Sequence, residues 1–311
     1  MIARIRTWLK GMNEWGKAFV LALLILLVLH FFVLRWVIVE STSMFATLRP
    51  GDLVLVQRWP VWTGVRRGDI VVFRDPLKDH VSMVRRPLLV KRIVGMPGDV
   101  VELRKGRLYV NNKPVQFGGE PTRAYLVRLE KAEDVDALLD TLGLPKSMVQ
   151  AGRSVVELPL NEALAMQVRR MPFVVSVEAM RLSSGAPRHV FPFSQAYPWN
   201  SDDYGPIIIP AKGDTVKLNA ANLPLYDRLI GVYEGHELGV DRNTLQLDGK
   251  PLERYGFEQN YYFVLGDGRH HSADSRYWGF LPEDHITGRA SLLLWGNGSY
   301  GARSGRDWSP L

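Results

Sequence analysis

The sequence predicts a mainly β protein of antiparallel sheets, with a small α+β insert and one N-terminal transmembrane helix. Three observations favour this fold class. An uncharged apolar run occupies residues 18–34. Beyond residue 40, short runs rich in Val, Leu and Ile alternate with turn signals such as Pro-Gly-Asp. Between residues 119 and 205, apolar residues at helical spacing interrupt this β pattern.

Composition excludes several classes of protein. The 311 residues are 46% hydrophobic and 23% charged, which excludes a disordered chain and a polytopic membrane protein. The absence of cysteine excludes disulfides, thiolate catalysis and cysteine-based metal sites. The net charge of +7 suits anionic partners or a merely basic surface. Outside the N-terminus the basic residues are dispersed, so we expect no nucleic-acid partner.

The N-terminal segment is expected to anchor the protein in a membrane. As a helix, residues 18–39 would be roughly 33 Å long, enough to cross a bilayer core of about 30 Å. The run is longer than the apolar core of a cleavable signal peptide, so we expect an uncleaved anchor. Four basic residues and one acid precede the run: Arg4, Arg6, Lys10, Lys17 and Glu14. The positive-inside rule then places residues 1–17 in the cytoplasm and the chain after residue 40 outside.

The remainder is expected to form a β-rich domain, split in sequence, with an inserted subdomain. Residues 40–118 and 206–311 contain the strand-like runs, and Asn111-Asn112 is typical of a hairpin turn. Residues 119–205 form the expected α+β insert. Its helices are predicted near 134–142 and after a capping Asn161, and its strands near 124–129, 155–158 and 173–177. The purpose of the insert cannot be read from the sequence.

Two patches contain candidate catalytic residues. Ser41 and Ser43 directly follow the apolar run, and Lys91 lies within an otherwise apolar strand. Such a lysine is most often at a sheet edge with its charge in water. Close to a serine in the fold, however, a buried neutral amine can act as a general base, because burial lowers a lysine pKa. Arg92 is expected to point to the opposite face of the strand.

With these residues in place, the chain resembles bacterial type I signal peptidases, membrane-anchored serine proteases with a Ser–Lys dyad. Residues 41–48 match the nucleophile motif Ser-x-Ser-Met-x-Pro-Thr-Leu except at Ala46. Residues 67–73 match Arg-Gly-Asp-Ile-Val-Val-Phe, and residues 91–99 match the lysine motif Lys-Arg-x-x-Gly-x-Pro-Gly-Asp. Residues 266–280 contain the last motif, so four motifs follow the apolar run in the family's order.

The resemblance implies a role for each matching residue. Ser43 would be the nucleophile and Lys91 its general base. The Ser43 backbone N–H and the Ser41 hydroxyl would form the oxyanion hole. Ser272 would hydrogen-bond and orient Lys91. Asp274 and Arg276 would form a supporting ion pair, Arg92 would also support the site, and Met44 would contact substrate.

The resemblance also implies a substrate and a location. The expected reaction removes signal peptides, through an acyl-enzyme, from exported preproteins with small residues before the cut. No cofactor and no metal ion are expected. The partners would be the preprotein and the lipid bilayer of the bacterial inner (cytoplasmic) membrane. The protein would cross this membrane once, with its catalytic domain on the outer, periplasmic side. The sequence does not predict an oligomeric state.

Two departures from the family pattern leave alternatives open. Ala46 replaces the usual proline beside the nucleophile, and Gly268, His270 and His271 alter the last motif. The histidine pair is interpreted as a solvent-facing loop change, because no third ligand at zinc-site spacing is apparent. The chain could instead be a catalytically silent homologue that binds preproteins or partners an active peptidase. A self-cleaving Ser–Lys repressor is disfavoured by the apolar anchor and by the absence of a helix-turn-helix pattern.

Overall fold

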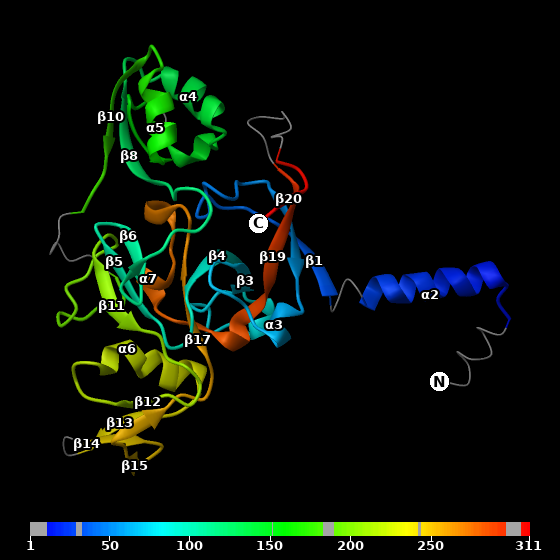
Figure 1. Cartoon of the computed structure of the whole chain (residues 1–311), viewed down its shortest axis with the longest axis vertical. Helices are drawn as coiled ribbons and strands as arrows, with labels where there is room; N and C mark the ends of the chain where they lie inside the picture. Colours follow the sequence, from blue (N-terminus) through cyan, green and yellow to red (C-terminus); the bar gives the residue numbers. More distant parts are fainter. Residues whose placement is uncertain (1–10, 29–32, 151, 183–189, 242–243, 297–305) are drawn as a thin grey trace.

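The computed structural model describes residues 11–28, 33–150, 152–182, 190–241, 244–296 and 306–311. Every sheet in these ranges is antiparallel, as expected (Figure 1). The short helical elements outside the insert are α3 (Pro60–Thr63), η2 (Met83–Arg85), α6 (Leu223–Arg228), η4 (Leu229–Tyr233), η5 (Arg269–His271), α7 (Ser275–Trp278) and η6 (Glu283–His285).

The largest sheet joins parts of the chain that are far apart in sequence. Its order is β1-β2-β19-β3-β4-β17-β18, and β20 pairs with β19. Strand β19 therefore separates β2 from β3, although those two strands are near neighbours in sequence. The strands are β1 (Leu34–Ile38), β2 (Leu53–Gln57), β3 (Ile70–Arg74), β4 (Leu88–Gly95), β17 (Tyr261–Leu265), β18 (Leu281–Pro282), β19 (Ile286–Trp295) and β20 (Ser309–Pro310).

This sheet is buried on both faces around β3. Ile70 and Val72 pack in one cluster with Met44 and Leu48. Val71 and Phe73 pack in a second cluster on the other face. Successive strand side chains point to opposite faces, so a continuous apolar run fills both clusters.

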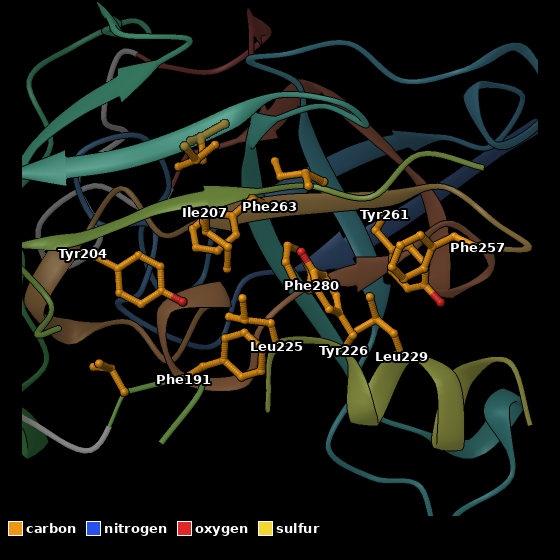
Figure 2. Close-up of a cluster of buried hydrophobic side chains, with 14 of the residues drawn as sticks. Phe191, Tyr204, Ile207, Leu225, Tyr226, Leu229, Phe257, Tyr261, Phe263 and Phe280 are labelled. Carbon is orange, nitrogen blue, oxygen red and sulfur yellow. The ribbon is translucent and has the colours of Figure 1, made fainter. Parts of the chain in front are cut away.

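A second sheet and several hairpins complete the β-rich domain. The second sheet has the order β11-β5-β6-β7 and shares an aromatic-rich core with β17 (Figure 2). The predicted turn at Asn111 and Asn112 is present between β6 and β7, with φ of 50° and 61°. The strands here are β5 (Val100–Arg104), β6 (Arg107–Val110), β7 (Lys113–Pro114), β11 (Tyr204–Ile208), β12 (Thr215–Lys217), β13 (Leu238–Asp241), β14 (Thr244–Leu247), β15 (Lys250–Pro251) and β16 (Arg254–Gly256).

Within the segment expected to be an α+β insert (119–205), residues 123–179 form a separate three-stranded sheet with two helices, seen at the top of Figure 1. The end of the expected segment differs, because Phe191 and Tyr204 pack in the core of the β-rich domain. The Asn161 side chain caps the second α-helix of this segment, Glu162–Arg169, by accepting the Leu164 N–H at 2.9 Å. Leu138, Leu158 and Val168 are among the residues of its separate core. The elements are β8 (Arg123–Leu129), α4 (Asp134–Leu142), η3 (Lys146–Met148), β9 (Val155–Leu160), α5 (Glu162–Arg169) and β10 (Val174–Ala179).

The N-terminal helix differs from the expectation. Helix α2 (Glu14–Val28) extends away from the β-rich domain, and residues 29–32 lie outside the described residues (Figure 1). Residues 34–38 were expected to be helical, but they form β1 and pair with β2 from Leu34↔Gln57 to Ile38↔Leu53. Strand pairing in the sheet overrides the apolar pattern there. Among the described residues, no helix is long and apolar enough to cross a bilayer.

Candidate active site

Ser43 lies in a turn between β1 and β2 that is packed on two sides. The Phe45 and Leu48 N–H groups donate to the Thr42 and Met44 carbonyls, both at 2.8 Å, and these bonds fix the turn. Leu48 is buried in the core of the large sheet, whereas Phe45 is buried in the core of the insert. The nucleophile turn is therefore held by both parts of the fold.

Lys91 on β4 contacts the Ser43 hydroxyl directly. The Lys91 Nζ donates to Ser43 Oγ at 2.7 Å and to the Val90 carbonyl at 3.1 Å. Both side chains are buried, and Lys91 is only 4% exposed. The structure thus brings together the two residues that the sequence paired as nucleophile and base.

Burial changes the protonation of Lys91. Desolvation lowers the pKa of the Lys91 amine from 10.5 to about 8, although the nearby carboxylates of Asp274 and Asp267 act in the opposite direction. A large fraction of the amine is therefore neutral in mildly alkaline solution. A neutral amine at hydrogen-bond distance from a hydroxyl can accept its proton.

Two groups proposed for the oxyanion hole lie beside the nucleophile. The Ser41 Oγ is 3.1 Å from the Ser43 Oγ. The Ser43 carbonyl accepts the Gly268 N–H at 2.9 Å, while no acceptor for the Ser43 N–H is found in the described part of the chain. This N–H therefore remains available to a ligand.

Ser272 differs from its predicted role. Its side chain is buried near the dyad, but its Oγ has no hydrogen-bond partner among the described residues. The predicted bond to Lys91 is absent. A Cβ placed on Gly266 would lie 2.2 Å from Ser272 Oγ and 2.4 Å from the Ser43 carbonyl oxygen. The Ser272 hydroxyl therefore packs against the Gly266 backbone, and only glycine fits at that position.

The predicted ion pair of Asp274 and Arg276 is present and completely buried. Their closest side-chain atoms are 2.8 Å apart. Asp274 also accepts the Gly266 N–H at 3.0 Å, and Arg276 donates to the carbonyls of Ser201 and Arg269. The pair thereby ties the end of β17 to the loop that contains Ser272. We refer to residues 266–276 as the catalytic loop.

Arg92 supports the site from the opposite face of β4, as strand alternation predicts. It forms an ion pair with Asp267 at 2.7 Å and donates to the Gly68 carbonyl at 2.7 Å. Asp267 also accepts the Thr47 hydroxyl at 2.5 Å. The sequence interpretation missed Asp267 and Thr47, although both lie inside the motifs that it singled out.

The histidine pair is not solvent-facing, so that interpretation was wrong. His270 Nδ1 accepts the Ala124 N–H at 3.2 Å, and its Nε2 lies 2.7 Å from Asp202. His271 Nε2 lies 3.4 Å from Glu157 on β9. The two histidines therefore contact strands β8 and β9 and the segment that leads into β11. No group of potential metal ligands is found among the described residues.

Met44 was expected to contact substrate, but it lies in the core. It is 1% exposed and packs with Leu48, Val54 and Ile70. In this conformation Met44 offers no surface to a peptide side chain.

A serine hydroxyl hydrogen-bonded to a buried amine of lowered pKa is typical of serine hydrolases. Residues 12–166 and 202–295 match the family model described as signal peptidase, peptidase S26. These segments include Ser43, Lys91 and the whole catalytic loop. The chain therefore belongs to the peptidase S26 family and is a serine endopeptidase.

Individual relatives support this assignment. The chain is 36% identical to signal peptidase I S of Bacillus subtilis over 135 residues, which are 43% of this chain and 67% of that protein. It is also 36% identical to signal peptidase I of Pseudomonas aeruginosa over 127 residues, 35% of this chain and 42% of that protein. This chain matches about half or less of the length of several signal peptidases I from Bacillus and Pseudomonas.

A structural comparison gives a weaker likeness. It matches the crystal structure of a signal peptidase I from Enterococcus faecalis at 15% identity, with a TM-score of 0.24. The match covers 73% of this chain and 97% of that one. The family assignment rests on the sequence matches.

Ala46 gives a test of the nucleophile turn. Its φ is 119°, which proline cannot adopt, since its ring fixes φ near −65°. Ala46→Pro, which restores the family motif, is expected to lower the free energy of unfolding by about 3 kcal/mol. Ala46→Gly is expected to match or exceed the parent, because glycine adopts positive φ without strain. Denaturant unfolding measures both, and a proline variant as stable as the parent would contradict this geometry.

Proposed function

We propose that this protein removes N-terminal signal peptides from exported preproteins by means of a Ser43–Lys91 dyad. The observation that supports the proposal best is the 2.7 Å hydrogen bond between Lys91 Nζ and Ser43 Oγ in a buried site. The printed names of the relatives, signal peptidase I, indicate the substrate class. The proposal covers both the dyad and the substrate.

In the proposed reaction, neutral Lys91 accepts the Ser43 proton while Ser43 Oγ attacks the scissile carbonyl. The Ser43 N–H and the Ser41 hydroxyl stabilise the oxyanion. Lys91 then gives the proton to the leaving amine, and the mature protein departs. Lys91 next takes a proton from the water that attacks the acyl-enzyme and returns it to Ser43 Oγ as the acyl–oxygen bond breaks. The signal peptide departs as a carboxylic acid, which ionises in water, and the dyad is restored.

In this proposal, the residues around the dyad hold Ser43 and Lys91 in place and take no part in the chemistry. Arg92 with Asp267 holds β4 against the nucleophile turn, and Asp274 with Arg276 holds the catalytic loop. Gly266 lies between the Ser272 side chain and the Ser43 carbonyl and is close to both. Their proposed contribution is to keep Ser43 and Lys91 within reaction distance, on which the rate depends steeply.

We further propose that the protein works at a lipid bilayer. Large apolar side chains are exposed along α2, including Phe19, Leu24 and Leu26. Trp36 and Ile38 on β1 and Trp62 on α3, the last 67% exposed, present further apolar surface. Apolar surface of this extent favours contact with lipid. The basic residues that precede the helix favour a cytoplasmic N-terminus and a catalytic domain on the outer side.

The deciding experiment is cleavage of a purified preprotein with an Ala-x-Ala site. We expect one cut directly after the second alanine, identified by mass spectrometry of both products. A matched preprotein with leucine in place of that alanine is expected to remain intact. Binding of the preprotein without cleavage would identify a catalytically silent homologue and refute the proposed activity.

The pH dependence tests the base. Because Lys91 must be neutral, kcat/KM is expected to rise with pH and to level off above about pH 8, the pKa of the buried amine. The profile is measured on a soluble peptide substrate between pH 6 and about 10, with fold monitored by circular dichroism. A profile that is flat or falls across this range would contradict a lysine base.

A further inference from the structure

A cavity of about 540 Å³ lies beside the catalytic loop. Its wall is formed by the β6–β7 hairpin, the segment that leads into β8, and the loop itself. Three arginines line it, Arg107, Arg123 and Arg269, together with the acids Glu120 and Asp267. The proposed reaction uses none of these three arginines.

Arg269 is the unusual member of this wall. It is 8% exposed, and its Nε and Nη1 have no hydrogen-bond partner among the described residues. Arg276, which is completely buried, differs because its guanidinium contacts Asp274 and two carbonyls. A buried guanidinium without an anion or an acceptor is unfavourable, so an anionic ligand is the expected complement.

The acids in the wall are already engaged. Both carboxylate oxygens of Asp267 accept hydrogen bonds from Arg92, and one also accepts the Thr47 hydroxyl. Glu120 accepts the backbone N–H of Glu162 at 3.3 Å. Burial and the nearby charge of Arg276 lower the pKa of Arg269 to about 10, so the guanidinium remains charged at neutral pH. The carboxylates of Asp267 and Asp274 act in the opposite direction on this pKa, but neither forms a hydrogen bond with the Arg269 guanidinium among the described residues.

The rim of the cavity adds further positive charge. The exposed Arg107 has no side-chain partner within the described ranges, and Arg123 donates only to the Gly106 carbonyl, at 3.2 Å. A neighbouring cavity of about 440 Å³ shares Arg107 and Arg123 and adds three more cations, Arg104, Lys105 and Arg181. Glu162 also lines the second cavity and Arg104 is paired with Glu102, but basic side chains still outnumber acidic ones across the two cavities.

We propose that this cavity binds a phosphate group, with Arg269 at its base and Arg107 and Arg123 at its rim. Guanidinium groups suit phosphate because their planar donors bind two oxygens at once. Inorganic phosphate and the phosphodiester headgroup of a lipid share this chemistry. The Arg269 carbonyl accepts from Arg276, so an anion on Arg269 would also stabilise the catalytic loop.

Calorimetric titration of the purified full chain tests the site, with inorganic phosphate and glycerophosphoglycerol as the two probes. We expect saturable binding of at least one probe. Arg269→Gln and Arg107→Gln are each expected to weaken it about tenfold, the effect of losing one charge-assisted hydrogen bond. Arg85→Gln, which removes an exposed arginine outside the cavity, is the matched control and is expected to change nothing.

The two probes distinguish the sources of the ligand. Tighter binding of inorganic phosphate would indicate a free phosphate, whereas tighter binding of the diester would indicate a lipid headgroup. Arg107 is exposed, so its variant remains informative if Arg269→Gln fails to fold. Absence of saturable binding, or equal affinity in Arg107→Gln and Arg85→Gln, would overturn the proposal. None of these readouts depends on preprotein cleavage.

Discussion

Lys91→Met is expected to lower preprotein cleavage by about a thousandfold or more and, at the same time, to stabilise the fold at pH 7. Activity is lost because, in the part of the chain that the structure describes, only the neutral Ser41 hydroxyl also lies within hydrogen-bond distance of Ser43 Oγ. Stability rises because the buried ammonium is removed. A pKa lowered from 10.5 to about 8 corresponds to about 3 kcal/mol. Denaturant unfolding and a cleavage assay measure the two effects.

The stabilisation by Lys91→Met is expected to decrease as the pH rises. In the parent, the unfolded chain holds the Lys91 proton up to about pH 10.5, whereas the folded chain releases it near pH 8. The cost of the buried charge is therefore complete below pH 8 and disappears as pH rises towards 10.5. The advantage of Lys91→Met should shrink between pH 7 and 9.5. Ser43→Ala is the control, since it should lose activity without this pH-dependent gain. A Lys91→Met variant that cleaves like the parent would refute the dyad.

Arg276→Met is expected to lower the free energy of unfolding by about 3–5 kcal/mol, because it leaves the completely buried Asp274 carboxylate without its counter-charge. Combining it with Asp274→Asn should recover part of the loss, since the uncompensated charge is then gone. Lys146→Met, which breaks an exposed ion pair with Asp136, is the matched control and should cost less than about 1 kcal/mol. A loss of that small size in Arg276→Met would contradict a structural role for the buried pair.

Local pattern predicts where some residues lie on the fold, although their roles in the site stay predictions. Lys91 and Arg92 occupy successive positions on β4, so strand alternation alone sends them to opposite faces. The Asn111-Asn112 turn follows equally from local backbone preference. Pairing Lys91 with Ser43 required the resemblance to a family, because β4 contacts the nucleophile turn only in the folded protein.

The predictions that were wrong concern packing between distant segments. Nothing local to His270 and His271 shows that Ala124, Asp202 and Glu157 lie beside them. Ser272 likewise turns towards Gly266, a contact set by the path of the catalytic loop. The strand at 34–38 exists because β2 supplies its partner. In each case tertiary contacts outweigh the local pattern.

The position of β19 between β2 and β3 has a consequence for biosynthesis. Both neighbours leave the ribosome more than two hundred residues before Ile286–Trp295, an interval of roughly 10–40 s at typical rates of elongation. During that time each has an open edge where β19 will later pair, and the catalytic loop arrives only shortly before β19. The catalytic loop and β19 are therefore the last parts of the site to be synthesised, so the complete site forms only when the sheet closes.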